Sequence, residues 1–318
     1  MKILFITHPY PNYVPDLLLH GLRKLLGPDV VDHPRKQCLY DGVLGLGICP
    51  DDQRCPGWFP PDEGTVDRTN IWQKVHKNYF DIVLCDFRSI GEFAKQTKQW
   101  PRRFVIIDGE DTPQFIPPGP YVICRRETDG SDFSIPVPMA LPEELFRWIT
   151  AYDELPKRYS IGFLGSTNDG KRKKLVEAIA ARFQNTLFQA TDVPSASQPL
   201  PTGRLGREAY YQQLQQCRIV LTLAGAGYDT FRFWEHAACR AVNFASRFPL
   251  FIPHEFEDGS EIIRFSTHTE LFQKLEEFLE HQEQSASVIR NMREKLFQFH
   301  LTTHRATYLI DRVGRAFG

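Results

Sequence analysis

The sequence predicts an α/β fold of two Rossmann-like, doubly wound domains that face each other across a cleft. The chain has 318 residues, which is enough for two domains of ordinary size. Its apolar runs are short and continuous, as in strands that helices cover on both faces. The same order of strand, loop and helix restarts after residue 157. We therefore expect an N-terminal domain over residues 1–150, a C-terminal domain over residues 151–300, and a terminal helix over residues 301–318 that packs back on the N-terminal domain.

The first half of the chain alternates apolar runs with helical stripes. Strands are expected over residues 2–7, 30–32, 81–86, 103–108 and 121–124, and helices over residues 16–26 and 89–99. The segment 34–67 contains glycine, proline and cysteine without clean periodicity, so we interpret it as an irregular insertion. Prolines at positions 136, 138 and 142 argue against regular structure over residues 129–142. The domain boundary is expected between that segment and Lys157.

The second half repeats the pattern. Strands are expected over residues 160–164, 186–189, 218–223 and 241–244, and helices over residues 171–183, 208–216 and 230–239. A loop rich in proline, serine and glycine is expected over residues 192–204. From His268 onward the apolar residues follow helical spacing, which predicts a series of amphipathic helices.

The composition excludes several classes of protein. The formal net charge is -1, so no global field would draw the chain to a polyanion or an anionic membrane. No apolar run approaches the roughly 20 residues that cross a bilayer, and the apolar start is too short for a signal peptide. We therefore expect a cytoplasmic protein with no integral membrane segment.

The cysteines favour the same location. The chain has 7 of them, an odd number, and several lie in or beside apolar runs. Buried free thiols in a reducing compartment explain this pattern. The pair Cys49 and Cys55 lacks the usual spacing of a zinc site and has no paired histidine motif nearby, so no metal is expected.

The most informative stretch runs from position 208 to position 244. An apolar strand ends there at Leu223, a loop with Gly225, Gly227 and Tyr228 follows, and a helix begins near Thr230. The amide groups and the positive dipole end of a helix start suit a diphosphate. Glycine pairs alone mark many ordinary turns, so the signal depends on the residues that follow.

Arg232 and Glu235 share one face of that helix. Arg232 could stabilise the charge of a departing nucleotide diphosphate, and Glu235 could accept hydrogen bonds from ribose hydroxyls. The alternative is structural: Glu235 complements the helix dipole, and Arg232 is a solvated surface residue.

This stretch resembles the GT-B glycosyltransferases, and within them the spore-maturation-protein-like and exostosin-like transferases, whose C-terminal domain is similar to that of glycosyltransferase family 1. The matching residues are Arg232, Phe233, Trp234, Glu235, Ala238 and Val242. The resemblance covers roughly residues 159–317, including the segment PLFIPHEFEDGSEIIRF. Arg240 replaces the usual glycine of the pattern. Gly227 stands where retaining relatives carry a second glutamate, which favours an inverting reaction.

The resemblance also implies roles for two residues earlier in the second half. Gly165 ends a strand in a small-residue turn, and relatives use the corresponding glycine to let the backbone approach the donor. A basic helix start follows, from which Arg172 would meet phosphate. The alternative for these basic residues is a solvated charge run that opens a surface helix.

Two candidates for a catalytic base lie in the first half. His8 directly follows the first strand, where inverting relatives often place a general base, and a neutral imidazole can take a proton from a hydroxyl. Asp108 and Asp111 lie at the end of the strand expected over residues 103–108. Either carboxylate could be the base, orient His8 or bind acceptor hydroxyls. The alternatives are a loop histidine that forms hydrogen bonds and a polar turn with a helix cap.

The resemblance therefore implies a glycosyltransferase. It would move a sugar from a nucleotide-sugar, its co-substrate, to an acceptor hydroxyl, with inversion and without a metal or another cofactor. The acceptor is left open among a glycan, a small molecule, a protein and a nucleic acid. The alternatives are a nucleotide-sugar epimerase on the same fold and a non-catalytic nucleotide-sugar-binding module. A nicotinamide-dependent dehydrogenase is disfavoured, because no Gly-x-Gly-x-x-Gly follows a strand.

Overall fold

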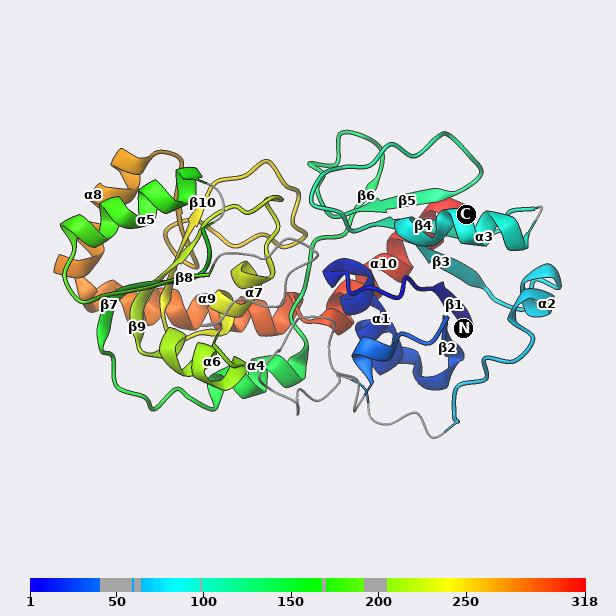
Figure 1. Cartoon of the computed structure of the whole chain (residues 1–318), viewed down its shortest axis with the longest axis horizontal. Helices are drawn as coiled ribbons and strands as arrows, with labels where there is room; N and C mark the ends of the chain where they lie inside the picture. The colour runs from blue at the N-terminus through cyan, green and yellow to red at the C-terminus, as the bar shows by residue number, and fades with distance from the viewer. Residues whose placement is uncertain (41–58, 60–63, 98, 168–169, 192–204) are drawn as a thin grey trace.

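A computed structural model describes residues 1–40, 59, 64–97, 99–167, 170–191 and 205–318. The described residues form two α/β lobes, each around one parallel sheet (Figure 1). Cys49, Cys55 and the loop predicted over residues 192–204 lie outside the described residues, as does most of the insertion predicted over residues 34–67.

The first sheet has the strand order β2-β1-β3-β4-β5-β6, and all its pairs are parallel. Its strands are β1 (Ile3–Ile6), β2 (Val30–His33), β3 (Ile82–Asp86), β4 (Phe104–Asp108), β5 (Val122–Arg125) and β6 (Ile135–Pro136). Alternate residues of β1 enter separate cores: Ile3 and Phe5 pack in the core with α1 (Tyr13–Leu26) and α10 (Thr302–Phe317), whereas Leu4 and Ile6 pack with α2 (Ile71–His76) and α3 (Ile90–Gln96). Helices therefore cover both faces, as the continuous apolar runs predict.

The second sheet has the order β11-β10-β9-β7-β8, again with parallel pairs. Its strands are β7 (Tyr159–Ser166), β8 (Thr186–Thr191), β9 (Cys217–Thr222), β10 (Val242–Ser246) and β11 (Ile263–Phe265). The helices are α4 (Glu143–Thr150), α5 (Gly170–Arg182), α6 (Arg207–Gln215), α7 (Phe231–Ala238), α8 (His268–Glu280) and α9 (Ser285–Phe299). The 3₁₀ helices are η1 (Gly27–Asp29), η2 (Gln37–Leu39), η3 (Phe87–Ser89) and η4 (Gln282–Gln284). One core holds residues of α5 and α8, and residues of α6, α7 and α9 lie in the other.

The chain joins the two lobes at a pair of crossing segments. The amide of Leu141 donates to the carbonyl of His300 over 3.0 Å, and the amide of Thr302 donates to the carbonyl of Leu141 over 3.0 Å. From this point α10 runs back against α1 in the first lobe (Figure 1). The two helices approach closely at Gly21, where a Cβ atom would lie 2.0 Å from the carbonyl oxygen of Thr302.

Some elements differ from those predicted. The segment 129–142, expected to be irregular because of its prolines, contains β6, in which Pro136 pairs with Arg125 at the edge of the sheet. An edge strand tolerates proline, because the missing amide is not needed by a further neighbour. The helices α2 and α4 and the edge strand β11 were also not predicted; they are short, with six, eight and three residues.

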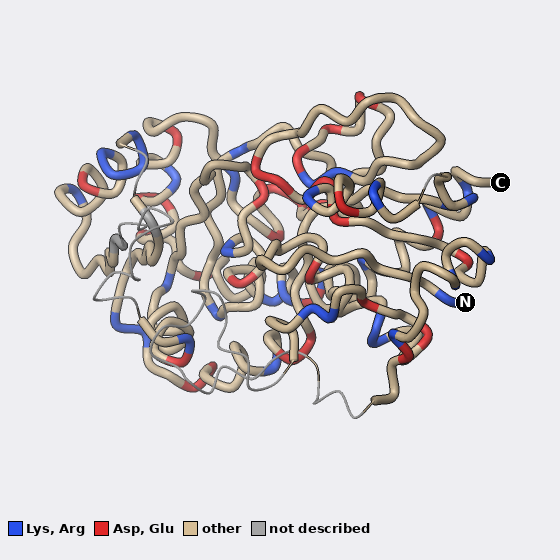
Figure 2. The backbone as a smooth tube through the Cα atoms, turned by 45° about the vertical axis from the view of Figure 1, so that its right-hand side comes forward, with Lys and Arg blue, Asp and Glu red and all other residues tan. Residues whose placement is uncertain are grey.

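In the described part of the chain, the surface charges agree with the near-zero net charge, and the cysteines agree with the expectation of free thiols. Basic and acidic residues are distributed over both lobes (Figure 2). The described cysteines are Cys38, Cys85, Cys124, Cys217 and Cys239, and all five are free thiols. Within the described ranges, no helix is long and apolar enough to cross a membrane.

Candidate active site

Each sheet has one point at which the strand order reverses. These switch points lie between β1 and β3 in the first sheet and between β7 and β9 in the second. In open α/β sheets, ligands bind outside the carboxyl ends of the strands at such points. The predicted site residues lie there: His8 follows β1, Gly165 is the penultimate residue of β7, and Gly225 and Gly227 follow β9.

On the second lobe, Gly165 makes room for Arg232. A Cβ atom on Gly165 would lie 2.5 Å from Nη2 of Arg232, so any larger residue would displace the guanidinium. The guanidinium carbon of Arg232 lies 5.7 Å from the ring centroid of Phe163. Among the described residues, no carboxylate forms an ion pair with Arg232. A half-buried guanidinium in this position can bind an anionic ligand.

Arg172 lies on the same phenylalanine ring, 6.0 Å from the centroid of Phe163. Its side chain is buried, and its guanidinium donates to the carbonyl of Ala224. A Cβ atom on Gly225 would lie 3.3 Å from Nη2 of Arg172. Arg172, predicted to meet phosphate, therefore supports the loop after β9.

Glu235 is buried, and its carboxylate accepts hydrogen bonds from two tyrosines of α6. The hydroxyl of Tyr211 lies 2.7 Å from Oε1, and the hydroxyl of Tyr210 lies 3.2 Å from Oε2. Burial raises the pKa of Glu235, while the hydrogen bond from Tyr211 and the charge of Arg232 oppose that rise. The two tyrosines were not predicted as site residues, although they stand side by side on a predicted helix.

The start of α7 has unused hydrogen-bonding capacity. Thr230 is the N-cap residue, with an extended backbone (φ -107, ψ 140), and its side-chain oxygen accepts no hydrogen bond from the helix amides. Its Oγ1 atom is buried and has no hydrogen-bond partner in the described part of the chain. The ring of Tyr13, from the first lobe, stacks on Phe231 with 4.9 Å between centroids. A hydroxyl and free amides at a helix start are groups that can bind an anion.

The loop between β9 and α7 touches the first lobe directly. The amides of Tyr228 and Asp229 donate to the carboxylate of Glu127, and Nε of Arg126 donates to the carbonyl of Asp229 over 3.1 Å. A Cβ atom on Gly227 would lie 3.0 Å from the carbonyl oxygen of Asp111. The carboxyl ends of the two sheets thus face each other at this loop.

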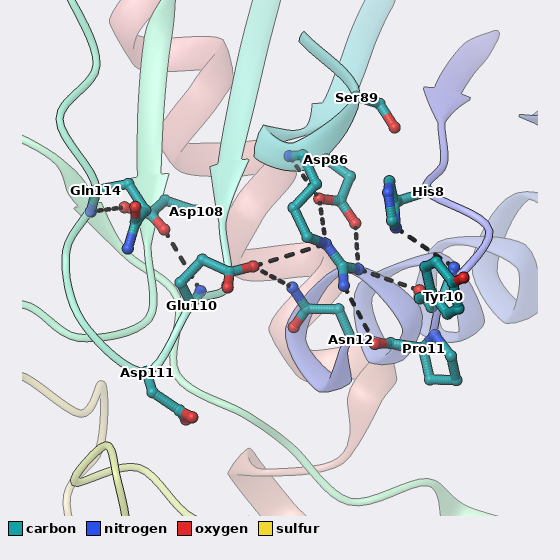
Figure 3. Close-up of polar contacts among 12 residues, drawn as sticks. His8, Tyr10, Pro11, Asn12, Asp86, Ser89, Asp108, Glu110, Asp111 and Gln114 are labelled. Carbon is teal, nitrogen blue, oxygen red and sulfur yellow. Dashed lines mark hydrogen bonds and ion pairs between the residues drawn. The ribbon is translucent and has the colours of Figure 1, made fainter. Parts of the chain in front are cut away.

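His8 lies at the switch point of the first sheet (Figure 3). The buried ammonium of Lys36 donates to the carbonyls of His8 and Tyr10, each over 2.7 Å, and pairs with Asp16 over 2.8 Å. Partial burial lowers the pKa of His8, and the nearby charge of Arg88 lowers it further. The imidazole is therefore neutral near pH 7, as a general base must be.

Asp108 and Asp111 have different surroundings. Asp108 is buried, and its carboxylate accepts the amides of Gln114 over 2.8 Å and Glu110 over 3.4 Å, so it shapes the turn after β4. Asp111 is half-exposed and pairs with Arg126 over 2.8 Å. Figure 3 shows Asp111 well apart from the loop that carries His8. The structure therefore brings Asp111 to the loop between β9 and α7 rather than to His8.

A charged cluster beside His8 was not predicted. Arg88 pairs with Asp86 over 2.9 Å and with Glu110 over 3.6 Å, and it donates to the carbonyl of Tyr10 over 3.1 Å. The side chain of Asn12 donates to Glu110 over 3.1 Å (Figure 3). Asp86 ends a strand as Asp108 does, and that parallel was a usable signal in the sequence. The cluster gives this edge of the sheet polar groups suited to hydroxyl ligands.

A surface pocket elsewhere does not belong to the site. It is lined by Val75, Phe80, Arg102 and Arg103, among others, at the amino ends of β3 and β4. That is the opposite edge of the sheet from His8.

Comparison with known proteins agrees with this geometry. The model of a family described as glycosyl transferase-like matches residues 167–311. HepE from Anabaena, solved in complex with UDP and glucose, has a TM-score of 0.59 and 11% identity, with 99% of this chain and 100% of HepE covered. Sucrose-phosphate synthase from Thermosynechococcus elongatus has a TM-score of 0.60 and 11% identity, with 100% of this chain and 99% of the synthase covered. A glycosyltransferase from Rickettsia africae has a TM-score of 0.58 and 8% identity, covering 99% and 98%. No curated protein matches the chain by sequence.

The two facing parallel sheets define a GT-B fold. Since the C-terminal half also matches a glycosyl transferase-like family, the chain is a glycosyltransferase of GT-B type. The predicted fold class and enzyme class are confirmed. The narrower resemblance to spore-maturation-protein-like and exostosin-like transferases stays a prediction, as do the individual site residues and the domain bounds.

Proposed function

We propose that this glycosyltransferase moves a sugar from a nucleotide-sugar to an acceptor hydroxyl by a single inverting displacement, without a metal. The observation that carries the proposal is the group formed by Gly165, Arg232, Thr230 and Glu235 at the switch point of the second sheet. UDP-sugars are the first donors to test, because HepE was solved in complex with UDP-glucose.

In this proposal the donor lies along the start of α7. Its diphosphate accepts hydrogen bonds from the first amides of the helix and from the Thr230 hydroxyl, and it pairs with the Arg232 guanidinium. The ribose hydroxyls donate to the Glu235 carboxylate. Arg172 acts indirectly, because its guanidinium donates to the carbonyl of Ala224 at the start of the loop between β9 and α7, here called the donor loop (residues 223–230).

The acceptor reacts beside His8. The imidazole takes the proton of the acceptor hydroxyl, the oxygen forms a bond to the anomeric carbon, and the bond from that carbon to the nucleotide diphosphate breaks. The electron pair leaves with the diphosphate, whose growing charge is stabilised by Arg232 and the helix start. One displacement inverts the anomeric configuration. Because these groups supply the positive charge, the scheme uses no metal or other cofactor.

The remaining predictions belong to the same proposal. We assign Asp111, which pairs with Arg126, to binding an acceptor hydroxyl other than the one that reacts beside His8, and Asp108 shapes its turn. The acceptor remains open among a glycan, a small molecule, a protein and a nucleic acid. The free thiols of the described cysteines support a cytoplasmic location.

Product analysis tests the proposal. Wild-type protein is incubated with UDP-glucose and panels of acceptors, with and without a chelator, and the anomeric configuration of the product is read by NMR. We expect inverted product at the same rate in both conditions, and a loss of about 100-fold or more in His8→Ala. A donor altered without any acceptor would instead indicate an epimerase, and a donor bound but unchanged would indicate a binding module.

A further inference from the structure

The loop of residues 227–229 rests on one carboxylate of the other lobe. The amide of Tyr228 donates to Oε2 of Glu127 over 3.0 Å, and the amide of Asp229 donates to Oε1 over 2.9 Å. Each oxygen of Glu127 therefore accepts a different backbone amide. A carboxylate can satisfy both donors at once, whereas the amide side chain of a glutamine offers only one acceptor atom.

Gly227 allows this contact. A Cβ atom at that position would lie 2.5 Å from Oε1 of Glu127 and 2.9 Å from Nη2 of Arg126. Any residue larger than glycine would therefore push the carboxylate or the guanidinium away. The glycine is needed here because of a close approach between the two lobes.

The contact is buried and has a second support. Glu127 is 6% exposed and Asp229 is 2% exposed. The carboxylate of Asp229 accepts the amide of Met139 over 2.6 Å and the indole N–H of Trp234 over 2.9 Å. Trp234 belongs to α7, so the hydrogen bond to Asp229 fixes the loop relative to the helix that carries Arg232.

We propose that Glu127 is a positioning residue, which acts from the N-terminal lobe to hold the donor loop in the conformation that binds the nucleotide-sugar. This inference rests on the proposed function and goes beyond it, because it makes donor binding depend on a residue outside the donor lobe. Both oxygens of Glu127 accept amides of this loop, so the role assigned to Glu127 is to hold the loop and not to bind the donor. It sets where the loop ends and where α7 begins.

The first test compares Glu127→Ala and Glu127→Gln with wild type. The donor is whichever of the UDP-, GDP-, TDP- and CMP-sugars raises the wild-type melting temperature most. Loss of two charge-assisted hydrogen bonds should raise the donor KM and the donor Kd on the order of tenfold or more in Glu127→Ala, with a smaller change in kcat. Glu127→Gln, which can still accept one amide, should lie between Glu127→Ala and wild type.

Asp153 provides a matched control. Its carboxylate pairs with Arg293 over 2.6 Å and accepts the side-chain amide of Gln215 over 2.9 Å, and neither partner belongs to the loop between β9 and α7. Asp153→Asn should lower stability and leave the donor KM unchanged. A purely structural role of Glu127 would give the same pattern as this control, and that result would overturn the proposal.

A double-mutant cycle tests the contact itself. Gly227→Ala should raise the donor KM by displacing the Glu127 carboxylate. In the Glu127→Ala background the same glycine change should cost several-fold less, because the atom nearest to the added Cβ atom is gone. If the increases in donor KM of the two single variants simply multiply in the double variant, the inference is overturned. The proposed function is untouched by that result, as long as wild type binds the donor. Failure of wild type to bind any of the four donor types would overturn the proposed function and the inference together.

Discussion

The hydroxyl of Tyr211 donates a hydrogen bond to Oε1 of Glu235 over 2.7 Å. A second tyrosine, Tyr210, donates to Oε2 over 3.2 Å. A carboxylate has about four lone-pair sites, so these two bonds orient Glu235 and leave acceptor capacity for ligand hydroxyls. The helix α6 thereby fixes the side chain on which the proposed donor site depends.

The glycine at position 165 should control donor binding through Arg232. Gly165→Ala would place a Cβ atom 2.5 Å from Nη2 of Arg232 and shift the guanidinium. We expect the donor Kd, measured by calorimetry, to rise about tenfold, as for loss of one charge-assisted hydrogen bond. Gly170→Ala is the matched control, because nothing lies within 4 Å of its added Cβ atom. Equal donor affinity in the two variants would show that Arg232 does not bind the donor.

The pH dependence of turnover should report His8. The pKa of His8 is lowered from its ordinary value of 6.5, and the base acts in its neutral form. The value of kcat/KM should therefore rise with pH through a point below 6.5 and be flat near pH 7. In His8→Asn this acid limb should disappear, together with a loss of about 100-fold or more. An unchanged acid limb in the variant would assign it to another group.

The buried pair of Lys36 and Asp16 should stabilise the fold and the loop that carries His8. Lys36→Met would leave the Asp16 carboxylate buried without its cation, which costs about 3–5 kcal/mol in the free energy of unfolding. The double variant Asp16→Asn with Lys36→Met should lose less, because no buried charge is left unpaired. Urea denaturation measures both. A double variant that loses the full sum of the single losses would show that the two side chains act independently.

The contact between α1 and α10 gives a prediction about stability alone. Gly21→Ala would bring a Cβ atom 2.0 Å from the carbonyl oxygen of Thr302, so the helices must move apart. We expect a loss of about 1–3 kcal/mol in the free energy of unfolding. Gly314→Ala, within α10 but with nothing near its added Cβ atom, should gain up to about 1 kcal/mol. Equal stability of the two variants would contradict the close packing at Gly21.

Much of this architecture could be predicted, because its signals are local. Continuous apolar runs predicted the long strands, and the segment after Leu223 predicted a loop and a helix start, which the structure has at Thr230. The short edge strands β6 and β11 were missed, because two or three residues give no measurable period. No local pattern connects Gly165 with Arg232. Only the family resemblance assigned both residues to one site.

The contacts between the lobes could not be predicted. Glu127 follows a strand of the first sheet and binds amides about a hundred positions later, and no spacing rule connects such residues. Asp108 and Asp111 looked equivalent in the sequence, yet one is buried against backbone amides and the other pairs with Arg126. Tertiary structure, which sets burial and partners, separates them.

The most direct test of the donor site is thermal unfolding of wild type and Glu235→Ala with UDP-, GDP-, TDP- and CMP-sugars. A nucleotide-sugar in large excess over its Kd should stabilise wild type by about 2–4 kcal/mol, and the variant should lose that stabilisation. An equal shift in both proteins would contradict the assignment of Glu235 and Arg232 to the donor.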